Sequence, residues 1–198
     1  MSRDRPSPMA WSRTGRALSA AMLVTATLAL AACGQAQTVG SSGGPAPGKQ
    51  QTRVALQRLH TQANELLDGG ATAFRARLAE LRGVPVVVNQ WASWCGPCRF
   101  EFPFFQHLAK RYDGRVAFLG VDSQDARSDA RAFLKKLPVP YPHYYDENTS
   151  IARTFGGGRA WPTTAFFTAG GKLAFTHIGA YATQAKLDED ITKYALHD

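Results

Sequence analysis

The sequence predicts an α/β domain whose central sheet is mixed and flanked by helices on both faces. Two observations indicate this fold. Over residues 84–137, apolar runs typical of buried strands alternate with amphipathic segments, which is the pattern of parallel strands joined by helices. Farther along, a Gly-Gly turn at 169–171 separates two strand-like runs, 163–168 and 172–178, and predicts an antiparallel hairpin.

The most clearly marked element in the first half of the domain is the run at 84–91 (VPVVVNQW). This continuous β-branched and aromatic run predicts a strand buried on both faces and therefore central in the sheet. Before it, residues 71–82 place apolar side chains at helical spacing and predict an amphipathic helix. Residues 52–67 mix helical and extended spacing, and we expect a helix there before the turn at 68–70.

The remaining elements are predicted from the same patterns. In chain order they are a helix at 95–112, a strand at 115–122, a helix at 126–137, a short strand at 143–145, a short helix at 147–155 and a terminal helix at 184–196. A chain of 198 residues is long enough for one compact domain with a full core, and we expect a monomer.

Composition and charge limit the possible partners. The chain is 44% hydrophobic and 19% charged, as expected of a globular protein. The formal net charge is +8, but four Arg and one Asp of this balance lie within the first 32 residues, and no run of five basic residues occurs. The remaining charge suits a solvated surface near an anionic membrane. We therefore expect no nucleic-acid partner.

The N-terminus has the pattern of a secretory leader. Four Arg lie within the first sixteen residues, and residues 17–32 are apolar or small and uncharged. This stretch is shorter than the roughly 20 residues that a membrane-spanning helix needs, so a permanent transmembrane helix is the weaker alternative. We assign residues 1–32 to a signal peptide, 33–51 to a flexible Gly-, Ser- and Pro-rich tether, and 53–198 to the folded domain.

Cys33 directly follows the leader. The run LAAC at 30–33 resembles the lipobox of bacterial lipoproteins, in which the cysteine is linked to diacylglycerol and becomes the first mature residue. A chance cysteine in an ordinary leader is the alternative, but it would leave an odd thiol in an oxidising compartment if the other two cysteines pair. We expect lipidation at Cys33 and a location at the extracytoplasmic face of the cell membrane.

The motif Trp94-Cys95-Gly96-Pro97-Cys98 lies where the buried strand ends and a helix begins. The free N–H groups and positive end of that helix favour a thiolate, and the pKa of Cys95 would fall from about 8.5 to about 7 or below. Cys95 is the expected nucleophile, and Cys98, one helical turn on, resolves the mixed disulfide. Pro97 suits the first turn because it lacks an N–H. Gly96 leaves the sulfur open to a large substrate, and Trp94 adds apolar surface around it.

Two alternatives for this cysteine pair are weaker. A structural zinc site needs two further ligands, but the sequence contains neither a second CxxC nor paired His spacing. A purely structural disulfide would close so short a loop that it would gain little loop entropy. We therefore expect a redox role, with no metal and no cofactor.

Residues 89–103 (NQWASWCGPCRFEFP) closely resemble the TlpA/ResA branch of the thioredoxin superfamily, whose members are tethered to the membrane and act outside it. The resemblance covers about residues 66–196 and includes the run WPTT at 161–164. It implies a thioredoxin-like fold with an extra helix and strand, at about 116–155, after the CxxC helix and the strand that follows it. It also implies that Pro162 is a cis-proline beside the sulfurs, which leaves the backbone before it free to pair with a substrate strand.

Three residues bear on the mechanism that this resemblance implies. Thioredoxin has a buried Asp six positions before the first cysteine, where this chain has Asn89, which cannot accept a proton. Glu101 matches a glutamate near the thiols of ResA-like proteins and could serve Cys98 in proton transfer, with an exposed surface acid as the alternative. Trp161 is bulkier than the residue common before the cis-proline. We expect it to cap the sulfurs or, alternatively, to pack as a half-buried core aromatic.

The expected activity is thiol-disulfide exchange with exported proteins or peptides that contain disulfides. The Gly-Pro dipeptide between the cysteines resembles that of reducing members of the family. It favours reduction of the substrate, for example in cytochrome c maturation, and the resemblance then implies an integral-membrane electron donor. A disulfide-forming oxidase of the same fold is one alternative. A thiol peroxidase, whose Pro-x-x-x-Thr-x-x-Cys context is missing here, and a peptide-binding redox module are the others.

Overall fold

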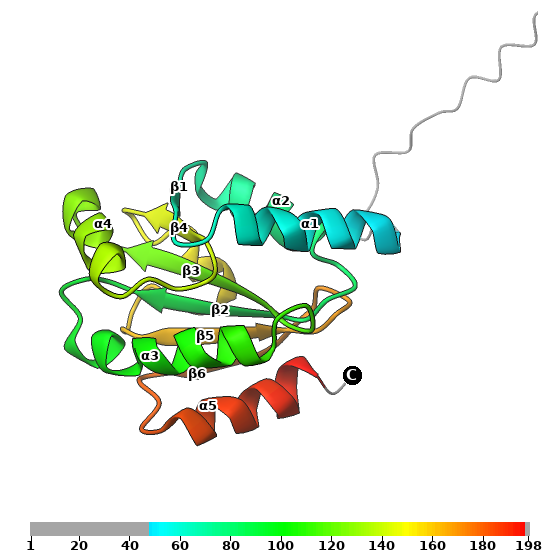
Figure 1. The fold of residues 1–198 in the computed structure, drawn as a ribbon. Helices are drawn as coiled ribbons and strands as arrows, with labels where there is room; N and C mark the ends of the chain where they lie inside the picture. Colours follow the sequence, from blue (N-terminus) through cyan, green and yellow to red (C-terminus); the bar gives the residue numbers. More distant parts are fainter. Residues whose placement is uncertain (1–47, 197–198) are drawn as a thin grey trace, which may run out of the picture. The chain divides into compact units, whose positions relative to one another are not determined.

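The computed structural model describes residues 48–196, which form a six-stranded sheet with helices on both sides (Figure 1). The strands are β1 (Leu66–Leu67), β2 (Val86–Trp91), β3 (Ala117–Ser123), β4 (His143–Asp146), β5 (Thr163–Phe167) and β6 (Leu173–Ile178). Their order across the sheet is β1-β4-β3-β2-β5-β6. The first four in this order pair in parallel, whereas β5 is antiparallel to both β2 and β6. The predicted mixed sheet is confirmed.

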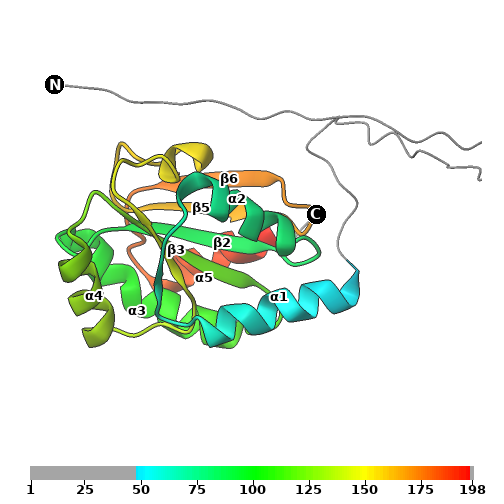
Figure 2. The ribbon, with the colours of Figure 1, turned by 90° about the horizontal axis from the view of Figure 1, so that it is seen from above.

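Helices cover both faces of this sheet (Figures 1 and 2). They are α1 (Lys49–Thr61), α2 (Gly70–Glu80), α3 (Gly96–Arg111), α4 (Arg127–Lys136), the 3₁₀ turn η1 (Ala152–Phe155), α5 (Gln184–Asp190) and its π-helical continuation η2 (Ile191–Ala195). Buried side chains of α3, α4 and α5 join one hydrophobic cluster, and those of α1, α2 and η1 join another. Among the described residues, none of the helices combines the length and apolarity that crossing a bilayer requires.

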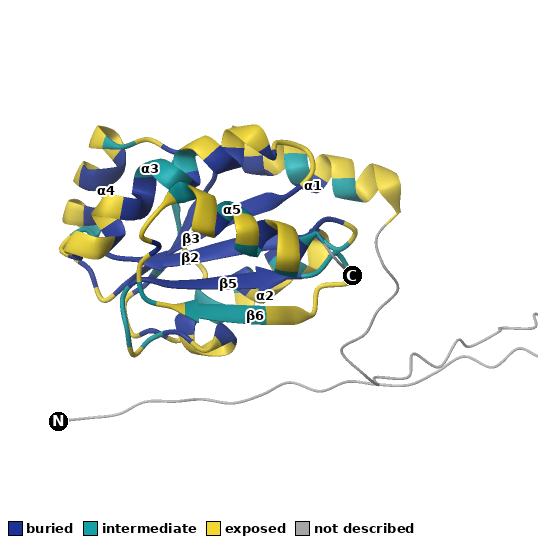
Figure 3. Ribbon diagram, turned by 90° about the horizontal axis from the view of Figure 1, so that it is seen from below, coloured by how far each residue is buried: buried dark blue, intermediate teal, exposed yellow. Residues whose placement is uncertain are grey.

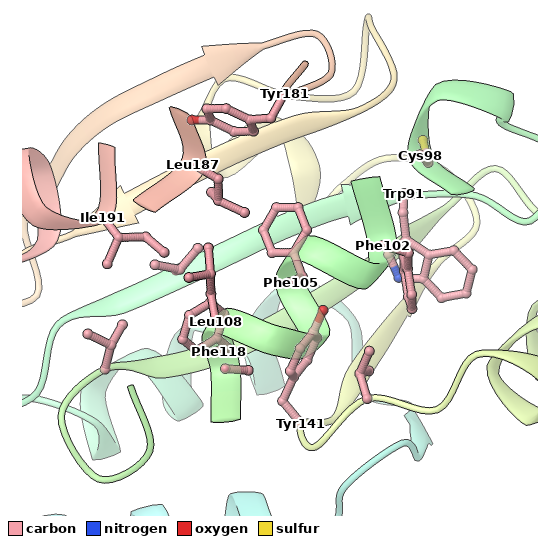
Figure 4. Close-up of a cluster of buried hydrophobic side chains, with 14 of the residues drawn as sticks. Trp91, Cys98, Phe102, Phe105, Leu108, Phe118, Tyr141, Tyr181, Leu187 and Ile191 are labelled. Atoms are coloured by element: carbon pink, nitrogen blue, oxygen red, sulfur yellow. The ribbon is translucent and has the colours of Figure 1, made fainter. Parts of the chain in front are cut away.

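Strand β2 is the centre of the domain, and all six of its residues are buried (Figure 3). Val87 and Trp91 belong to the cluster under α3, whereas Val86 and Val88 belong to the cluster under α1 and α2. This division follows from the alternation of side chains along a strand. Figure 4 shows Trp91 close to Phe102 of α3. Burial on both faces explains the continuous apolar run in the sequence.

Two segments near the start of the domain differ from their predictions. Helix α1 begins at Lys49, so residues 49–51, assigned to the tether, lie in its first turn. The helix ends at Thr61, and Leu66 and Leu67, predicted to be helical, form the edge strand β1 instead. Pairing of β1 with β4 supplies backbone hydrogen bonds to a segment whose apolar spacing favours neither structure.

Of the short helix predicted at 147–155, only the last four residues are helical, and they form the 3₁₀ turn η1. The carboxylate of Asp146 explains the difference, because it accepts hydrogen bonds from the backbone N–H groups of Ile151 and Ala152. It also accepts one from the hydroxyl of Ser123. These bonds compete with helix formation directly after β4, and the helical turn begins only at residue 152.

A buried polar contact fixes the sheet on the α3 side. The Nε1–H of Trp91 donates to Nδ1 of His143, 3.0 Å away, and both side chains are fully buried. Burial lowers the pKa of His143 to about 3, so the imidazole is neutral at physiological pH. His143 lies opposite Gly120 of β3, where a Cβ would be only 1.8 Å from Nδ1. The close approach therefore requires glycine at position 120.

We predict that Gly120→Ala destabilises the protein, because the added methyl group would overlap the imidazole of His143. Overpacking of this kind lowers the free energy of unfolding by about 1–3 kcal/mol, which urea denaturation would measure. Gly170→Ala is the matched control, since its Cβ would meet only Oγ1 of Thr168, at 3.6 Å. Equal stability of the two variants would contradict this description of the packing.

Candidate active site

Cys95 and Cys98 meet at the junction of β2 and α3. They form a disulfide, with their Cα atoms 5.3 Å apart. Cys95 is the N-cap residue of α3, and its Sγ accepts a hydrogen bond from the backbone N–H of Cys98, 3.1 Å away. Pro97 lies in the first turn. The sulfur of Cys95 is thus at the positive end of a sixteen-residue helix, which favours the thiolate once the disulfide is reduced.

The two cysteines differ slightly in depth. Cys95 is 4% exposed and Cys98 only 1%, and both belong to the core cluster under α3. Figure 4 shows Cys98 at the edge of this cluster. Gly96 and Pro97 are exposed, and a Cβ placed at Gly96 would have no heavy atom within 4 Å. The surface beside Cys95 is therefore open, while Cys98 lies beneath it.

Pro162 lies at the same end of the sheet. The peptide bond between Trp161 and Pro162 is cis, as the resemblance implies. Strand β5 begins at Thr163, which is opposite Gln90 in the antiparallel pair with β2. Because Gln90 is close to the end of β2 that leads into the motif, the start of β5 lies beside the segment that carries Cys95.

Two tryptophans at this end of the sheet contact each other. The ring centroids of Trp94 and Trp161 are 5.6 Å apart. Trp94 is 55% exposed, yet its Nε1–H donates to the carbonyl oxygen of Gln124 at 2.8 Å. The Nε1–H of Trp161 donates to the carbonyl oxygen of Ser123 at 3.2 Å. Trp161 is half-buried and packs against the cluster that contains both cysteines, in agreement with a half-buried core aromatic.

The loop between β3 and α4 holds the segment before the cysteines, a contact that no sequence motif predicts. The carboxylate of Asp125 accepts hydrogen bonds from both the backbone N–H and the hydroxyl of Ser93, which precedes Cys95 by two residues. Gln124, whose carbonyl oxygen binds Trp94, has a φ of 55°, in the left-handed region that few residues other than Gly adopt. Since 32 residues separate Ser93 from Asp125, only the fold brings them together.

Glu101 is completely buried, so the alternative of an exposed surface acid is wrong. Its Oε1 accepts a hydrogen bond from Nδ2 of Asn89 at 3.0 Å, and its Oε2 accepts one from the backbone N–H of Tyr181 at 2.9 Å. Burial raises the pKa of Glu101 to about 7, although both hydrogen bonds act in the opposite direction. Cys98 and Glu101 are one helical turn apart, on the buried face of α3.

Asp122 is another buried acid, and no sequence motif predicts it. It is opposite Trp91 in the pairing of β2 with β3, and neither of its carboxylate oxygens has a hydrogen-bond partner among residues 48–196. Burial, and next the neighbouring carboxylate of Asp125, raise the pKa of Asp122 to about 9. An ionisable residue at the end of an apolar strand run was the signal that could have found it.

The described part of the site contains a pair of cysteines that can exchange disulfides and a buried carboxyl, Glu101, whose pKa burial raises to about 7. Within residues 48–196, no group of three or more His, Cys, Asp or Glu side chains is placed to hold a metal ion. Cys33, the leader and most of the predicted tether lie outside the described residues.

Two curated relatives of this chain are named for thiol-disulfide chemistry. The chain is 28% identical over 106 residues to the thiol-disulfide oxidoreductase ResA of Bacillus cereus, covering 53% of this chain and 61% of ResA. It is 32% identical over 117 residues to the thiol:disulfide interchange protein DsbE of Pseudomonas fluorescens, covering 59% of this chain and 64% of DsbE. The chain therefore spans about three fifths of the length of these curated relatives.

The fold and a family model agree with these relatives. The structure is similar to that of the exposed lipoprotein thioredoxin Etrx1 of Streptococcus pneumoniae, with a TM-score of 0.52 and 26% identity, over 59% of this chain and 89% of Etrx1. Residues 64–196, about two thirds of the chain, match the model of the Redoxin family, and this range includes all six strands and both cysteines of the disulfide. The chain therefore belongs to the Redoxin family, in the TlpA/ResA-like branch of the thioredoxin superfamily.

Proposed function

We propose that this protein is a thiol-disulfide oxidoreductase that reduces disulfides in exported proteins or peptides. The observation that carries the proposal is the Cys95–Cys98 pair at the N-terminus of α3, beside the cis peptide bond at Pro162. The names of the relatives, which refer to thiol-disulfide oxidoreductase and interchange activity, support it.

In the proposed reaction, the reduced cysteine pair transfers two electrons to a substrate disulfide. The thiolate of Cys95 attacks one substrate sulfur and forms a mixed disulfide, while the other substrate sulfur leaves and takes up a proton. Cys98 then loses its proton and attacks Sγ of Cys95, which forms the Cys95–Cys98 disulfide and releases the second substrate thiol. Two electrons and two protons from a donor restore the pair.

We assign Glu101 as the base that accepts the proton of Cys98. A base works best when its pKa is close to the operating pH, and the pKa of about 7 meets this condition. Asn89 and the backbone of Tyr181 hold the two carboxylate oxygens from opposite sides. Because Asn89 cannot titrate, the proton-transfer role that thioredoxin gives to a strand residue falls here to a residue of helix α3.

We also propose where the protein is located in the cell and in which direction electrons flow. The predicted leader and the lipobox-like run ending at Cys33 support a lipid-anchored protein at the extracytoplasmic face of the membrane. Similarity to a pneumococcal protein described as an exposed lipoprotein thioredoxin supports the same location. The Gly96-Pro97 dipeptide supports the reducing direction, in which an integral-membrane partner supplies electrons. Reduction of a disulfide in the apoprotein to two thiols during cytochrome c maturation is one role of this kind.

Replacing the resolving cysteine should trap the mixed disulfide. In a full-length chain whose third thiol is removed by Cys33→Ser, we expect Cys98→Ser to accumulate a covalent adduct with a disulfide-bonded peptide, since nothing resolves the adduct. Cys95→Ser should form no adduct and lose exchange activity. Non-reducing electrophoresis and mass spectrometry measure the adduct. Full exchange activity in Cys95→Ser would instead favour a binding module with vestigial cysteines.

The rate of the Cys98 step should increase with pH through about 7, as the carboxyl of Glu101 loses its proton. Glu101→Gln keeps the size of the side chain but cannot accept a proton. We expect this variant to slow the step by about 100-fold at pH 8 and to flatten its pH profile. Rapid-mixing kinetics with a disulfide peptide separate this step from the first attack. A wild-type profile retained by the variant would exclude Glu101 as the base.

The unfolding equilibrium of the oxidised protein gives an independent control on Glu101. Its pKa in the folded protein, about 7, lies above the ordinary value of 4.5, so the neutral carboxyl favours the folded state. This contribution is fully present below pH 4.5 and is lost as the pH increases through 7. The difference between the two pKa values corresponds to about 3 kcal/mol. Glu101→Gln should remove that part of the pH dependence in urea denaturation.

The reduction potential of the Cys95/Cys98 pair tests the direction of electron flow. We expect a value near that of thioredoxin, about −270 mV, because a reductant must hold its electrons at low potential. Equilibration in glutathione or dithiothreitol buffers measures it. A value near −120 mV, like that of the strong oxidant DsbA, would make the protein a disulfide donor and overturn the proposed direction.

A further inference from the structure

We infer that a groove between α3 and α4 binds a carboxylate-bearing, partly apolar segment of the substrate protein, next to the disulfide to be reduced. The inference rests on the proposed exchange activity and adds the chemistry of the substrate that the same site prefers.

The groove has a volume of about 410 Å³ and is formed by two helices that share one core cluster. Its apolar floor consists of the buried Phe133 and the half-buried Leu137, both from the α4 segment. Its rim carries three exposed charged residues, Arg99 of α3 and Asp129 and Lys136 of α4. Figures 2 and 3 show these two helices side by side.

The groove is lined by residues on both sides of the disulfide in the sequence. Ser93, two residues before Cys95, and Arg99, the residue after Cys98, both line it. Helix α4 follows β3, whereas Pro162 precedes β5, and these strands are the two opposite neighbours of β2. The groove and the cis-proline therefore flank the disulfide from opposite sides. A substrate joined to Cys95 can contact the backbone near Pro162 with one part of its chain and enter the groove with another.

The charges of the rim favour an anionic ligand. The backbone N–H of Arg99 donates to the carbonyl oxygen of Cys95, but among residues 48–196 the side chains of Arg99 and Lys136 make no hydrogen bond or ion pair, so both are available to a ligand. Asp129 is the single acidic residue of the lining. A guanidinium group can bind a carboxylate through two parallel hydrogen bonds, and the ammonium group adds a second positive charge. The apolar floor suits an aliphatic or aromatic side chain beside that carboxylate.

The expected preference is modest and sensitive to salt. An exposed ion pair contributes at most about 1 kcal/mol, which corresponds to a factor of about five in rate. Charges at the rim of an interface act mainly on the association rate. The preference should therefore appear at low ionic strength and disappear in 1 M salt, where the screening length is about 3 Å.

Two matched peptides test the inference on the full-length chain carrying Cys33→Ser. Both peptides contain the same disulfide and the same flanking apolar residue, but one has Glu and the other Gln at the positions next to a cysteine. The measurement is the second-order rate constant for peptide reduction at low and high salt. We expect the wild-type domain to reduce the Glu peptide about fivefold faster at low salt. Equal rates for the two peptides would overturn the inference.

A pair of neighbouring lysines provides the matched control. Lys136→Glu should abolish the preference for the Glu peptide, because it reverses a charge on the rim. Lys135→Glu makes the same change in the same last turn of α4, outside the groove lining, and should keep most of the preference. Asp129→Asn should increase the preference. Equal losses in the two lysine variants would mean that the diffuse charge of α4, rather than the groove, attracts the substrate.

A small uncharged disulfide, bis(2-hydroxyethyl) disulfide, distinguishes failure of the inference from failure of the proposed function. Wild type and Lys135→Glu should reduce it at the same rate, since it has no charge for the groove to bind and Lys135 is outside the groove lining. If the wild-type protein reduced neither this compound nor either peptide, the exchange activity itself would be contradicted. If it reduced all three disulfides but did not distinguish the peptides, only the groove assignment would be wrong.

Discussion

Packing of helix α3 on β2 places Glu101 in the core, where it binds Asn89, and the proton transfer that we propose depends on that burial. The buried face of α3 carries Cys98, Glu101, Phe102 and Phe105, so the packing that forms the core also buries a carboxyl one helical turn from the resolving cysteine. On the surface this carboxyl would ionise near pH 4 and would be a weak base at neutral pH. One contact between a helix and a strand therefore determines both the burial of Cys98 and the raised pKa of the carboxyl that we propose as its proton acceptor.

The site is assembled from three places in the chain that meet at one end of the sheet. The β2–α3 junction supplies the cysteines, the start of β5 supplies Pro162, and the loop after β3 connects to both. The indole N–H of Trp161 donates to the carbonyl oxygen of Ser123, the last residue of β3. In the loop itself, the carbonyl oxygen of Gln124 accepts from the indole N–H of Trp94, and Asp125 binds Ser93. Because the same loop leads into α4, the rim of the groove is attached to the backbone segment that carries Cys95.

Three parts of this fold could be predicted from short sequence patterns. The apolar run of β2, the CxxC at the start of α3 and the Gly-Gly hairpin each carry their signal within a few residues. Edge strand β1 does not, because its two leucines become extended only by pairing with β4. The burial of Glu101 and the Ser93–Asp125 contact were also outside the reach of local patterns, since both depend on packing between distant segments. The spacing of apolar residues in the sequence predicts helices and strands. The contacts that set the pKa of Glu101 and hold Ser93 are tertiary, and the spacing does not predict them.

Asp122 affects the charge at the end of the sheet where β2 leads to the cysteines, because it is opposite Trp91, the last residue of β2. With its pKa at about 9, this residue is uncharged at neutral pH, although a count of acidic side chains includes it as negative. The end of the sheet that bears Cys95 therefore carries less negative potential than the sequence suggests, and a sulfur anion forming there meets less repulsion. A buried carboxyl that stays protonated thus lowers the negative charge at this end of the sheet although the sequence counts it as an acid.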